Sequence, residues 1–242
     1  MIKITILGFA GRMGQAIARE VGDHPGCKLV GGVILQGTDA PRPDGVFVTS
    51  KTDEAIAIAD VVIDFTLAKA VPGNAQLAAK HNKAYVCGVT GLGANALDAI
   101  KQAAEKIPVV QASNTSMSLA VMKQLTTLAA KLLAGLDYDI AIYDEHHRLK
   151  QDAPSGTAKT LGEAVARGNS GKKAPSYASI RAGAIVGEHE VAFVGQGEII
   201  RLRHSVTDRR IFARGAVEAA LWLHGKPAGL YGMDDVMGMG KN

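Results

Sequence analysis

The chain has 242 residues, of which 47% are hydrophobic and 21% charged, and its formal net charge is +4. This composition is typical of a globular protein with one or two domains and a sizeable core. The basic residues are scattered, so we expect no nucleic-acid partner. No apolar run is long enough for a transmembrane helix, and the N-terminus does not read as a signal peptide. Cys27 and Cys87 form no motif, and we expect a cytoplasmic protein without disulfides.

The first half of the chain alternates short apolar runs with helical segments. Strands are expected at residues 2–7, 28–35, 60–66, 85–88 and 108–112, and helices at 15–21, 53–59, 71–81 and 95–106. Strands that alternate with helices of this length predict an α/β domain with a parallel, Rossmann-like sheet.

A glycine-rich turn follows the first expected strand. Its spacing, Gly8-x-x-Gly11-x-x-Gly14, differs from the commoner GxGxxG. Glycines allow the backbone to approach a pyrophosphate at a helix N-terminus, although a tight turn in any doubly wound protein would look similar. Ligands of such sheets bind at the carboxyl ends of the strands. The residues expected there, as a dinucleotide site, are Gly8, Phe9, Ala10, Gly11, Arg12, Met13, Phe65, Thr66, Gly88, Val89, Thr90, Ala112, Ser113, Asn114 and Thr115.

The end of the second strand leaves the choice of nicotinamide cofactor open. NAD sites usually place an acidic residue about 20 residues beyond the glycines, at the cofactor ribose. This chain has Ile34 and Leu35 there. Arg42 and Lys51 are near in sequence, but we interpret them as solvated loop charges. Both NADPH and NADH therefore remain candidates.

The second half of the chain has a different pattern. A long helix at residues 117–134, a strand at 138–143 and a helix ending at 167 are followed by an exposed loop at 168–176. Strands at 178–183, 188–195 and 198–206 then follow one another without helices, which predicts a mainly antiparallel sheet in an α+β domain. We expect residues 1–114 to form the dinucleotide-binding domain and 115–211 a second domain. A helix is expected at 211–224, and residues 212–242 are expected to pack back on the first domain. Too few helices remain to cover both faces of the second sheet, which suggests self-association.

The densest cluster of reactive side chains is the segment 144–158, DEHHRLKQDAPSGTA. Its Ser-Gly-Thr opens a helix, where free backbone N–H groups and the helix dipole favour an anion. Imidazole is the natural proton donor near neutral pH. A metal site and a purely structural turn are the two alternatives. Lys150 argues against a metal, because an ammonium repels a cation and attracts a carboxylate. We therefore expect an acidic small-molecule substrate beside a proton donor.

The segment 144–158 resembles a known family signature. The pattern His146-x-x-x-Lys150-x-Asp152-Ala-Pro-Ser-Gly-Thr-Ala158 is similar to that of the dihydrodipicolinate reductases, now called 4-hydroxy-tetrahydrodipicolinate reductases. The resemblance extends over nearly the whole chain. Segments in the family order are Gly8–Gly14, 60–66, 88–91, 186–189, 212–216 and 229–234.

The resemblance implies an enzyme of lysine and diaminopimelate synthesis. In this family a nicotinamide cofactor gives hydride to a cyclic imine dicarboxylate, which yields tetrahydrodipicolinate. His146 would be the proton donor, and Lys150 would assist catalysis and hold a carboxylate. The residues implied in substrate binding are His147, Lys150, Ser155, Gly156, Thr157 and Arg209. No metal is implied, and the family forms homotetramers through the sheets of the second domain.

The chain also departs from the family pattern. Asp144 stands where the family usually has Glu, Ala141 replaces another common Glu, and Thr115 stands where many members have Phe beside the nicotinamide. The chain is also short around residues 36–47, on the adenosine side. Two other hypotheses remain: a different Rossmann-type reductase of an amino-acid-like substrate, and a non-catalytic nucleotide sensor. The former would lack Lys150 and the Ser-Gly-Thr, and the latter would have no reason to retain His146 and Lys150.

Overall fold

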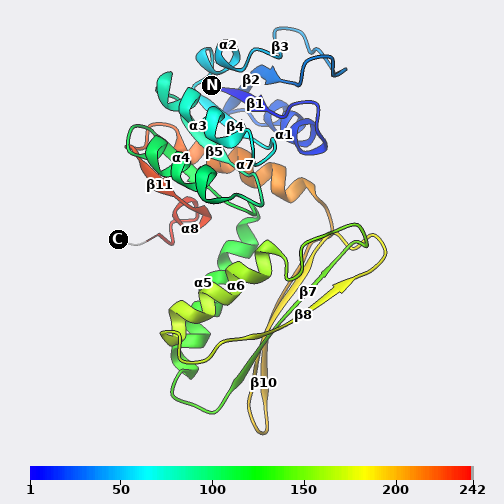
Figure 1. Cartoon of the computed structure of the whole chain (residues 1–242), viewed down its shortest axis with the longest axis vertical. Helices are drawn as coiled ribbons and strands as arrows, with labels where there is room; N and C mark the ends of the chain where they lie inside the picture. Colours follow the sequence, from blue (N-terminus) through cyan, green and yellow to red (C-terminus); the bar gives the residue numbers. More distant parts are fainter. Residues whose placement is uncertain (241–242) are drawn as a thin grey trace. The chain divides into compact units, whose positions relative to one another are not determined.

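The computed structural model describes residues 1–240 and divides into two compact units (Figure 1). Unit 1 consists of Met1–Thr115 together with the chain from Arg210 onward, and unit 2 consists of Ser116–Arg209. Within residues 1–240, no helix is long and apolar enough to cross a membrane.

Unit 1 is built on a seven-stranded sheet in which every strand pair is parallel. Its strand order is β11-β6-β5-β4-β1-β2-β3. This order reverses between β1 and β4, as in doubly wound nucleotide-binding folds. The predicted Rossmann-like sheet is confirmed. The strands are β1 (Ile2–Leu7), β2 (Cys27–Val33), β3 (Phe47–Thr49), β4 (Val61–Asp64), β5 (Ala84–Cys87), β6 (Pro108–Gln111) and β11 (Gly229–Tyr231).

Two of these strands have no counterpart among the predicted elements. β3 is only three residues long and pairs with β2, while β11 brings the C-terminal segment back to the sheet beside β6. A three-residue strand carries too little alternation for a periodicity argument to detect it. The helices of unit 1 are α1 (Arg12–Asp23), α2 (Thr52–Ala57), α3 (Val71–Lys80), α4 (Ala94–Ala104), α7 (Arg210–Leu223) and α8 (Met233–Val236).

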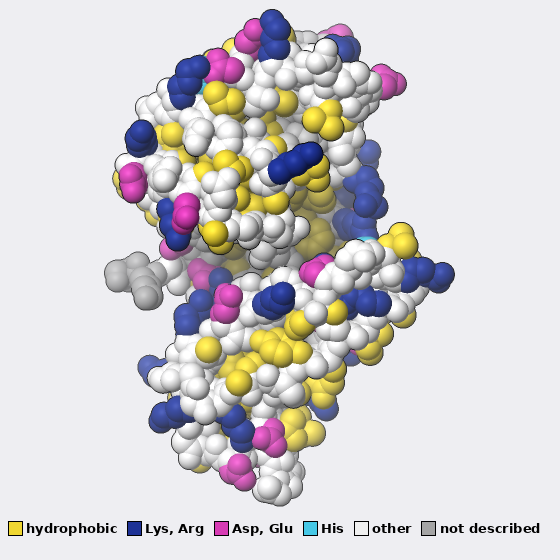
Figure 2. Space-filling model, viewed as in Figure 1, with side chains coloured by type: hydrophobic (Ala, Val, Ile, Leu, Met, Phe, Trp, Pro, Cys, Tyr) yellow, Lys and Arg dark blue, Asp and Glu magenta, His cyan; other side chains and the backbone are white. Residues whose placement is uncertain are grey.

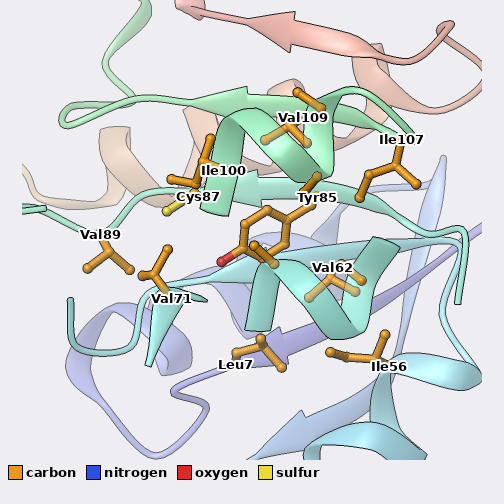
Figure 3. Close-up of a cluster of buried hydrophobic side chains, with 14 of the residues drawn as sticks. Leu7, Ile56, Val62, Val71, Tyr85, Cys87, Val89, Ile100, Ile107 and Val109 are labelled. Carbon is orange, nitrogen blue, oxygen red and sulfur yellow. The ribbon is translucent and has the colours of Figure 1, made fainter. Parts of the chain in front are cut away.

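A hydrophobic cluster between this sheet and α2, α3 and α4 forms much of the core of unit 1. Figure 3 shows the ring of Tyr85 among the apolar side chains of Val62, Ile100 and Val109. The Tyr85 hydroxyl is the polar exception, and it donates a 2.5 Å hydrogen bond to the Asp64 carboxylate at the end of β4. Burial raises the pKa of Tyr85 well above its usual value, so it remains a neutral donor. The pair anchors the carboxyl end of β4.

Unit 2 places two helices on one face of a four-stranded sheet (Figure 1). Its elements are α5 (Met117–Leu133), β7 (Asp139–His146), α6 (Gly156–Asn169), β8 (Ser176–Arg181), β9 (Glu188–Val194) and β10 (Ile199–Ser205). Residues that alternate along the strands, such as Ile142, Val191 and Phe193, face the helices and are fully buried with Leu161 of α6. This is the period-two pattern of a half-covered sheet.

The strand order of this sheet is β10-β9-β7-β8. Two expectations about its strands are corrected. The strand predicted at 138–143 lies at 139–146, so it includes His146 as its last residue. The strand predicted at 178–183 lies at 176–181 and pairs with β7 in parallel, not with β9. The reason is that α6 acts as the crossover between β7 and β8, which makes them a βαβ unit. The other two strand pairs are antiparallel, as expected for a mainly antiparallel sheet.

The outer face of this sheet is exposed in the described chain. Tyr143 is 36% exposed, and Ile180 and Ile199 are each 49% exposed. By strand alternation these side chains point away from α5 and α6. Figure 2 shows how hydrophobic, acidic and basic side chains intersperse on the visible surface of both units.

Candidate functional site

The turn after β1 depends on its glycines. Gly8 has a φ of +80°, and its carbonyl accepts a 3.0 Å hydrogen bond from the Gly11 N–H. A Cβ on Gly14 would lie 2.3 Å from the Gly8 carbonyl oxygen, so a larger residue would push α1 away from the turn. The three glycines therefore supply the backbone conformation and the close helix packing that a dinucleotide fingerprint requires.

The N-terminus of α1 is suited to hold an anion. Gly11 is its N-cap, no side chain caps the helix, and its first turn contains no acidic residue. The first N–H groups are therefore available to a pyrophosphate. A Cβ on Gly8 would lie 2.8 Å from the carbonyl oxygen of Phe65, so the loops after β1 and β4 touch at the point where the strand order reverses. This cradle fits a dinucleotide cofactor.

The other residues predicted at the carboxyl edge of this sheet differ in whether their side chains are exposed or buried. Thr66 is tied to Asp64 by a 2.6 Å hydrogen bond, and the Phe65 ring packs so closely on Gly88 that a Cβ there would lie 2.2 Å from it. The side chains of Phe9 and Val89 are buried in the core, so only their backbones are available to a ligand. Side chains that remain wholly or partly accessible are those of Ala10, Arg12, Met13, Phe65, Thr66, Thr90, Ser113 and Asn114.

Thr115 has a structural contact. Its side chain is buried, and its hydroxyl donates a 2.7 Å hydrogen bond to the Phe212 carbonyl of α7. A Cβ on Gly215 would lie 1.8 Å from the Thr115 carbonyl oxygen, so α7 passes directly against this backbone. The hydroxyl thus holds the end of unit 1 to α7. Ala112 is also buried.

A pocket of about 330 Å³ lies at the carboxyl ends of β2 and β3. Leu35, at the position where NAD sites usually carry an acid, is 77% exposed and lines it. Arg42 also lines the pocket and donates a 3.2 Å hydrogen bond to the Val48 carbonyl. Lys51 is instead paired with Glu54 at 2.9 Å. The arginine therefore supplies a cation at this pocket.

In unit 2 the centre of the candidate site is His146 at the end of β7. Its side chain is buried, and its Nδ1 lies 3.0 Å from an oxygen of Asp144. A Cβ on Gly187 would lie at an ordinary van der Waals distance of 3.4 Å from the Nε2 of His146, so Gly187 adjoins that nitrogen. Burial and the charge of Lys150 lower the pKa of His146, although Asp144 opposes the shift.

The buried carboxylate of Asp144 has two further partners, which come from β8. The Ser179 hydroxyl donates to it at 2.5 Å, and Arg181 lies 3.0 Å from it. Burial alone would raise the pKa of Asp144, but the Ser179 hydrogen bond and the Arg181 charge lower it below its ordinary value. Asp144 is therefore a carboxylate at neutral pH.

The loop after β7 carries donors that converge on a single carboxylate. Lys150 Nζ lies 2.6 Å from Asp152, and the Gly156 N–H donates to the other oxygen of that residue at 3.3 Å. Ser155 caps α6 by accepting a 3.1 Å hydrogen bond from Ala158. The predicted anion donors are therefore brought together, and Asp152 engages them. Burial would raise the pKa of Asp152, but the contact with Lys150 lowers it.

Two more histidines adjoin this cluster and were not assigned a role from the sequence. His189 lies directly opposite Asp144 in the sheet, and His204 lies opposite His189. The ring centroid of His189 is 5.1 Å from that of His146, and the Nε2 of His189 is 3.4 Å from Ser155 Oγ. Burial, followed by the charge of His146, lowers the pKa of His189 to about 3, so it remains neutral.

Ser179 and Arg181, the partners of Asp144 on β8, were also not singled out from the sequence. The signal that could have found them is strand alternation once the register is known. Ser179, Asp144, His189 and His204 form one row across the four strands. Separate segments of the sequence supply them, so no local motif unites them.

The remaining predicted substrate residues are less closely connected. His147 follows the last residue of β7 and is half-buried, while Thr157 is buried in the first turn of α6. Arg209 is exposed in the turn before α7, and within residues 1–240 no hydrogen bond or ion pair joins it to the His146 cluster. No group of three or more His, Cys, Asp or Glu side chains in that range is placed to hold a metal ion.

Both halves of the chain match models of one protein family. Residues 2–115 match the dihydrodipicolinate reductase N-terminus and residues 118–237 the dihydrodipicolinate reductase C-terminus. A 4-hydroxy-tetrahydrodipicolinate reductase of Zymomonas mobilis is 41% identical over 257 residues and one of Stenotrophomonas maltophilia is 43% identical over 239 residues. Each alignment covers 98% of this chain and 98% of the relative.

Solved structures share the fold at lower identity. Dipicolinate-bound dihydrodipicolinate reductase from Paenisporosarcina sp. TG-14 has a TM-score of 0.81 at 24% identity, covering 96% of this chain and 97% of that chain. A scyllo-inositol dehydrogenase from Lactobacillus casei, solved with NAD(H) and scyllo-inositol, has a TM-score of 0.63 at 13% identity, covering 98% of this chain and 93% of that one. These likenesses support the architecture of the chain.

Proposed function

Because this chain belongs to the dihydrodipicolinate reductase family, we propose that it reduces 4-hydroxy-tetrahydrodipicolinate to tetrahydrodipicolinate in lysine and diaminopimelate biosynthesis. The cofactor is NADPH or NADH. The observation that carries the proposal is the convergence of a buried imidazole, an ammonium and a helix N-terminus within one segment, 144–158. A cyclic imine dicarboxylate needs a proton donor and cations in this arrangement.

The side chains of unit 2 have complementary roles in this reaction. Lys150 and the N–H groups of Gly156 and Thr157 bind a substrate carboxylate, with Ser155 holding the helix end in place. His146 delivers a proton from Nε2 to the reduced substrate. Its pKa is lowered in the free protein, and a bound carboxylate raises it again because the added negative charge favours the imidazolium. His147 and Arg209 complete the proposed substrate contacts.

Unit 1 supplies the proposed cofactor site. Its glycine turn and the N-terminus of α1 bind the pyrophosphate, and the loops after β4, β5 and β6 orient the rest of the dinucleotide. When bound, the nicotinamide supplies the hydride. The proposed contacts are those predicted from the strand ends. They are made through the backbone at Phe9, Val89, Ala112 and Thr115, whose side chains are buried.

We also propose that the enzyme is a cytoplasmic homotetramer that associates through the outer face of the unit 2 sheet. Both α5 and α6 lie on the inner face, and exposed apolar side chains remain on the outer one. Salt bridges from Arg201 to Glu190 and from Arg203 to Glu188 flank those side chains. Cys27 and Cys87 are buried and unpaired, which suits a reducing compartment.

The first test measures cofactor oxidation at 340 nm with the enzymatically generated imine. His146→Gln and Lys150→Ala should each lower turnover about a hundredfold or more, because each removes a group that acts on the substrate. Cofactor affinity, measured by fluorescence titration, should be unchanged. Lys159→Ala is the matched control, because Lys159 lies on the exposed side of α6.

The same assay separates the proposal from its alternatives. A reductase for another amino-acid-like substrate would oxidise cofactor with that substrate and not with the imine. A nucleotide sensor would bind the cofactor without consuming it. Wild-type turnover in both His146→Gln and Lys150→Ala would show that neither residue is catalytic.

A further inference from the structure

Two pairs of facing residues on β7 and β8 surround the imidazole of His146. The strand register places Asp144 opposite Ser179 and His146 opposite Arg181. Because residues two apart on a strand share a face, all four side chains lie on the side of the sheet that carries α5 and α6. The Asp144 carboxylate accepts hydrogen bonds from Ser179 and interacts with Arg181 at 3.0 Å and with His146 Nδ1 at 3.0 Å.

The chemistry of these contacts determines which nitrogen of His146 carries the proton. An ionised carboxylate can only accept hydrogen bonds, so the nitrogen that faces Asp144 must be the donor. In the neutral ring this leaves Nε2, the nitrogen that adjoins Gly187, as the lone-pair nitrogen. Nε2 is then the position that exchanges a proton with a ligand.

We propose that Asp144, held by Ser179 and Arg181, is a positioning residue that fixes His146 with its proton on Nδ1 and its Nε2 toward the substrate. The proposal deepens the proposed reductase function and rests on it. Arg181 extends the arrangement to the substrate loop, because its Nη2 also donates a 2.6 Å hydrogen bond to the Asp152 carbonyl. One guanidinium thus ties the partner of the proton donor to the loop that carries Lys150.

Several charged and titratable groups face His146 and set the sign of its pH dependence. They are Asp144 from β7, Arg181 from β8, His189 from β9 and Lys150 from the following loop. Lys150 and Arg181 oppose protonation of the ring, His189 is neutral above pH 4, and Asp144 favours protonation. Removing the Asp144 charge should therefore lower the pKa of His146.

The tautomer can be measured in the full-length wild-type protein without substrate. In protein labelled with ¹⁵N-histidine, long-range ¹H–¹⁵N spectra at pH 8 distinguish Nδ1–H from Nε2–H, and loss of a signal in His146→Gln assigns the residue. We expect the Nδ1–H form in the wild type, its retention in Asp144→Glu and its loss in Asp144→Leu, whose side chain has no acceptor. A wild-type ring protonated on Nε2 would overturn the proposal.

Kinetics then separate positioning from a general effect on folding. Asp144→Asn should lower kcat about a hundredfold, while cofactor affinity remains that of the wild type. A proton donor must be protonated, so the decline of kcat/KM with rising pH should begin about one pH unit lower in this variant. Asp144→Glu should restore much of kcat and the wild-type pH profile. Asp139→Asn is the matched control on the same strand, because Asp139 is exposed and pairs only with Lys173 among the described residues.

The outcomes remain distinct if the variant is unstable. If the Asp144 variants fail to fold, the wild-type tautomer and the pH profile of kcat/KM for Ser179→Ala test the proposal. We expect that profile to shift in the same direction by a smaller amount. An unchanged tautomer in a folded Asp144→Leu, or an unshifted pH profile in a folded Asp144→Asn, would overturn the proposal. Failure of the reductase function itself would appear differently, as absence of imine reduction by the wild type, and would leave the NMR result unaffected.

Discussion

Asp152 shows how a single residue can occupy a site intended for a ligand. Its two carboxylate oxygens are bound by Lys150 Nζ at 2.6 Å and by the Gly156 N–H at 3.3 Å. These are the donors proposed to hold a substrate carboxylate, so ligand binding requires Asp152 to release them. The side chain of Asp152 is 51% exposed, and an ion pair at such a position is worth about 1 kcal/mol or less. A dicarboxylate ligand can therefore displace it.

Removing this competing charge should strengthen ligand binding. We expect Asp152→Asn to lower the KM for the imine about fivefold in the 340 nm assay, because the donors no longer satisfy an internal carboxylate. Asp137→Asn provides a control, since Asp137 is an exposed carboxylate near Lys173. A higher KM for the imine in Asp152→Asn would show instead that Asp152 orients Lys150 for the substrate.

At the residue scale, the sequence predicted the groups that belong to one segment and missed those that the sheet brings in. His146, Lys150 and Gly156 are within eleven positions, so their chemistry could be recognised as a local cluster. Arg181 and His189 depend on the pairing of β8 and β9 with β7, which local sequence does not encode. The proposed contact of Arg209 with the substrate remains a prediction.

At the scale of elements, the end of β2 is the part of the proposed cofactor site that is expected to meet the ribose. An acid at this position binds the ribose hydroxyls of NAD and repels the 2′-phosphate of NADP. The chain has the exposed Leu35 there, and Arg42 lines the adjoining pocket of about 330 Å³. The pocket therefore lacks the usual barrier to a phosphate and contains a cation that can bind it.

We accordingly expect Arg42→Ala to raise the Kd for NADPH about tenfold and to change the Kd for NADH little. Fluorescence titration of the variant with each cofactor measures both values. Lys51→Ala should change neither, because Lys51 pairs with Glu54 on the surface. An equal loss for the two cofactors would assign Arg42 to the structure of the loop, through its hydrogen bond to Val48.

The arrangement of the strands was predicted correctly where the alternation of strands and helices was long. It was predicted wrongly where the pairing of strands depends on the tertiary structure. The βαβ repetition of the first half predicted its parallel sheet, because buried strands and amphipathic helices alternate clearly there. In unit 2 the three consecutive strands suggested consecutive pairing. The crossover through α6 instead places β8 beside β7, and no feature of the strand sequences themselves distinguishes the two arrangements.

At the scale of the whole molecule, the outer face of the unit 2 sheet has a composition suited to contact with copies of the same chain. Tyr143, Ile180 and Ile199 expose apolar surface beside ion-paired arginines, and the described helices of this unit pack on the opposite face. An exposed face of this kind is stabilised when a second sheet covers it, because apolar area is then removed from water. The proposed homotetramer meets that requirement.

The mass of the assembly in solution tests this proposal. Light scattering should give four chains for the wild type and fewer for a double variant, Tyr143→Glu with Ile180→Glu, because burying two unpaired carboxylates in an apolar interface is strongly unfavourable. Both side chains are exposed in the single chain, so the variant should retain the circular dichroism spectrum of the wild type. Leu230→Glu serves as the control, since Leu230 is a similarly exposed apolar residue of unit 1. A wild type that is monomeric, or a double variant that still forms tetramers, would exclude this face as the interface.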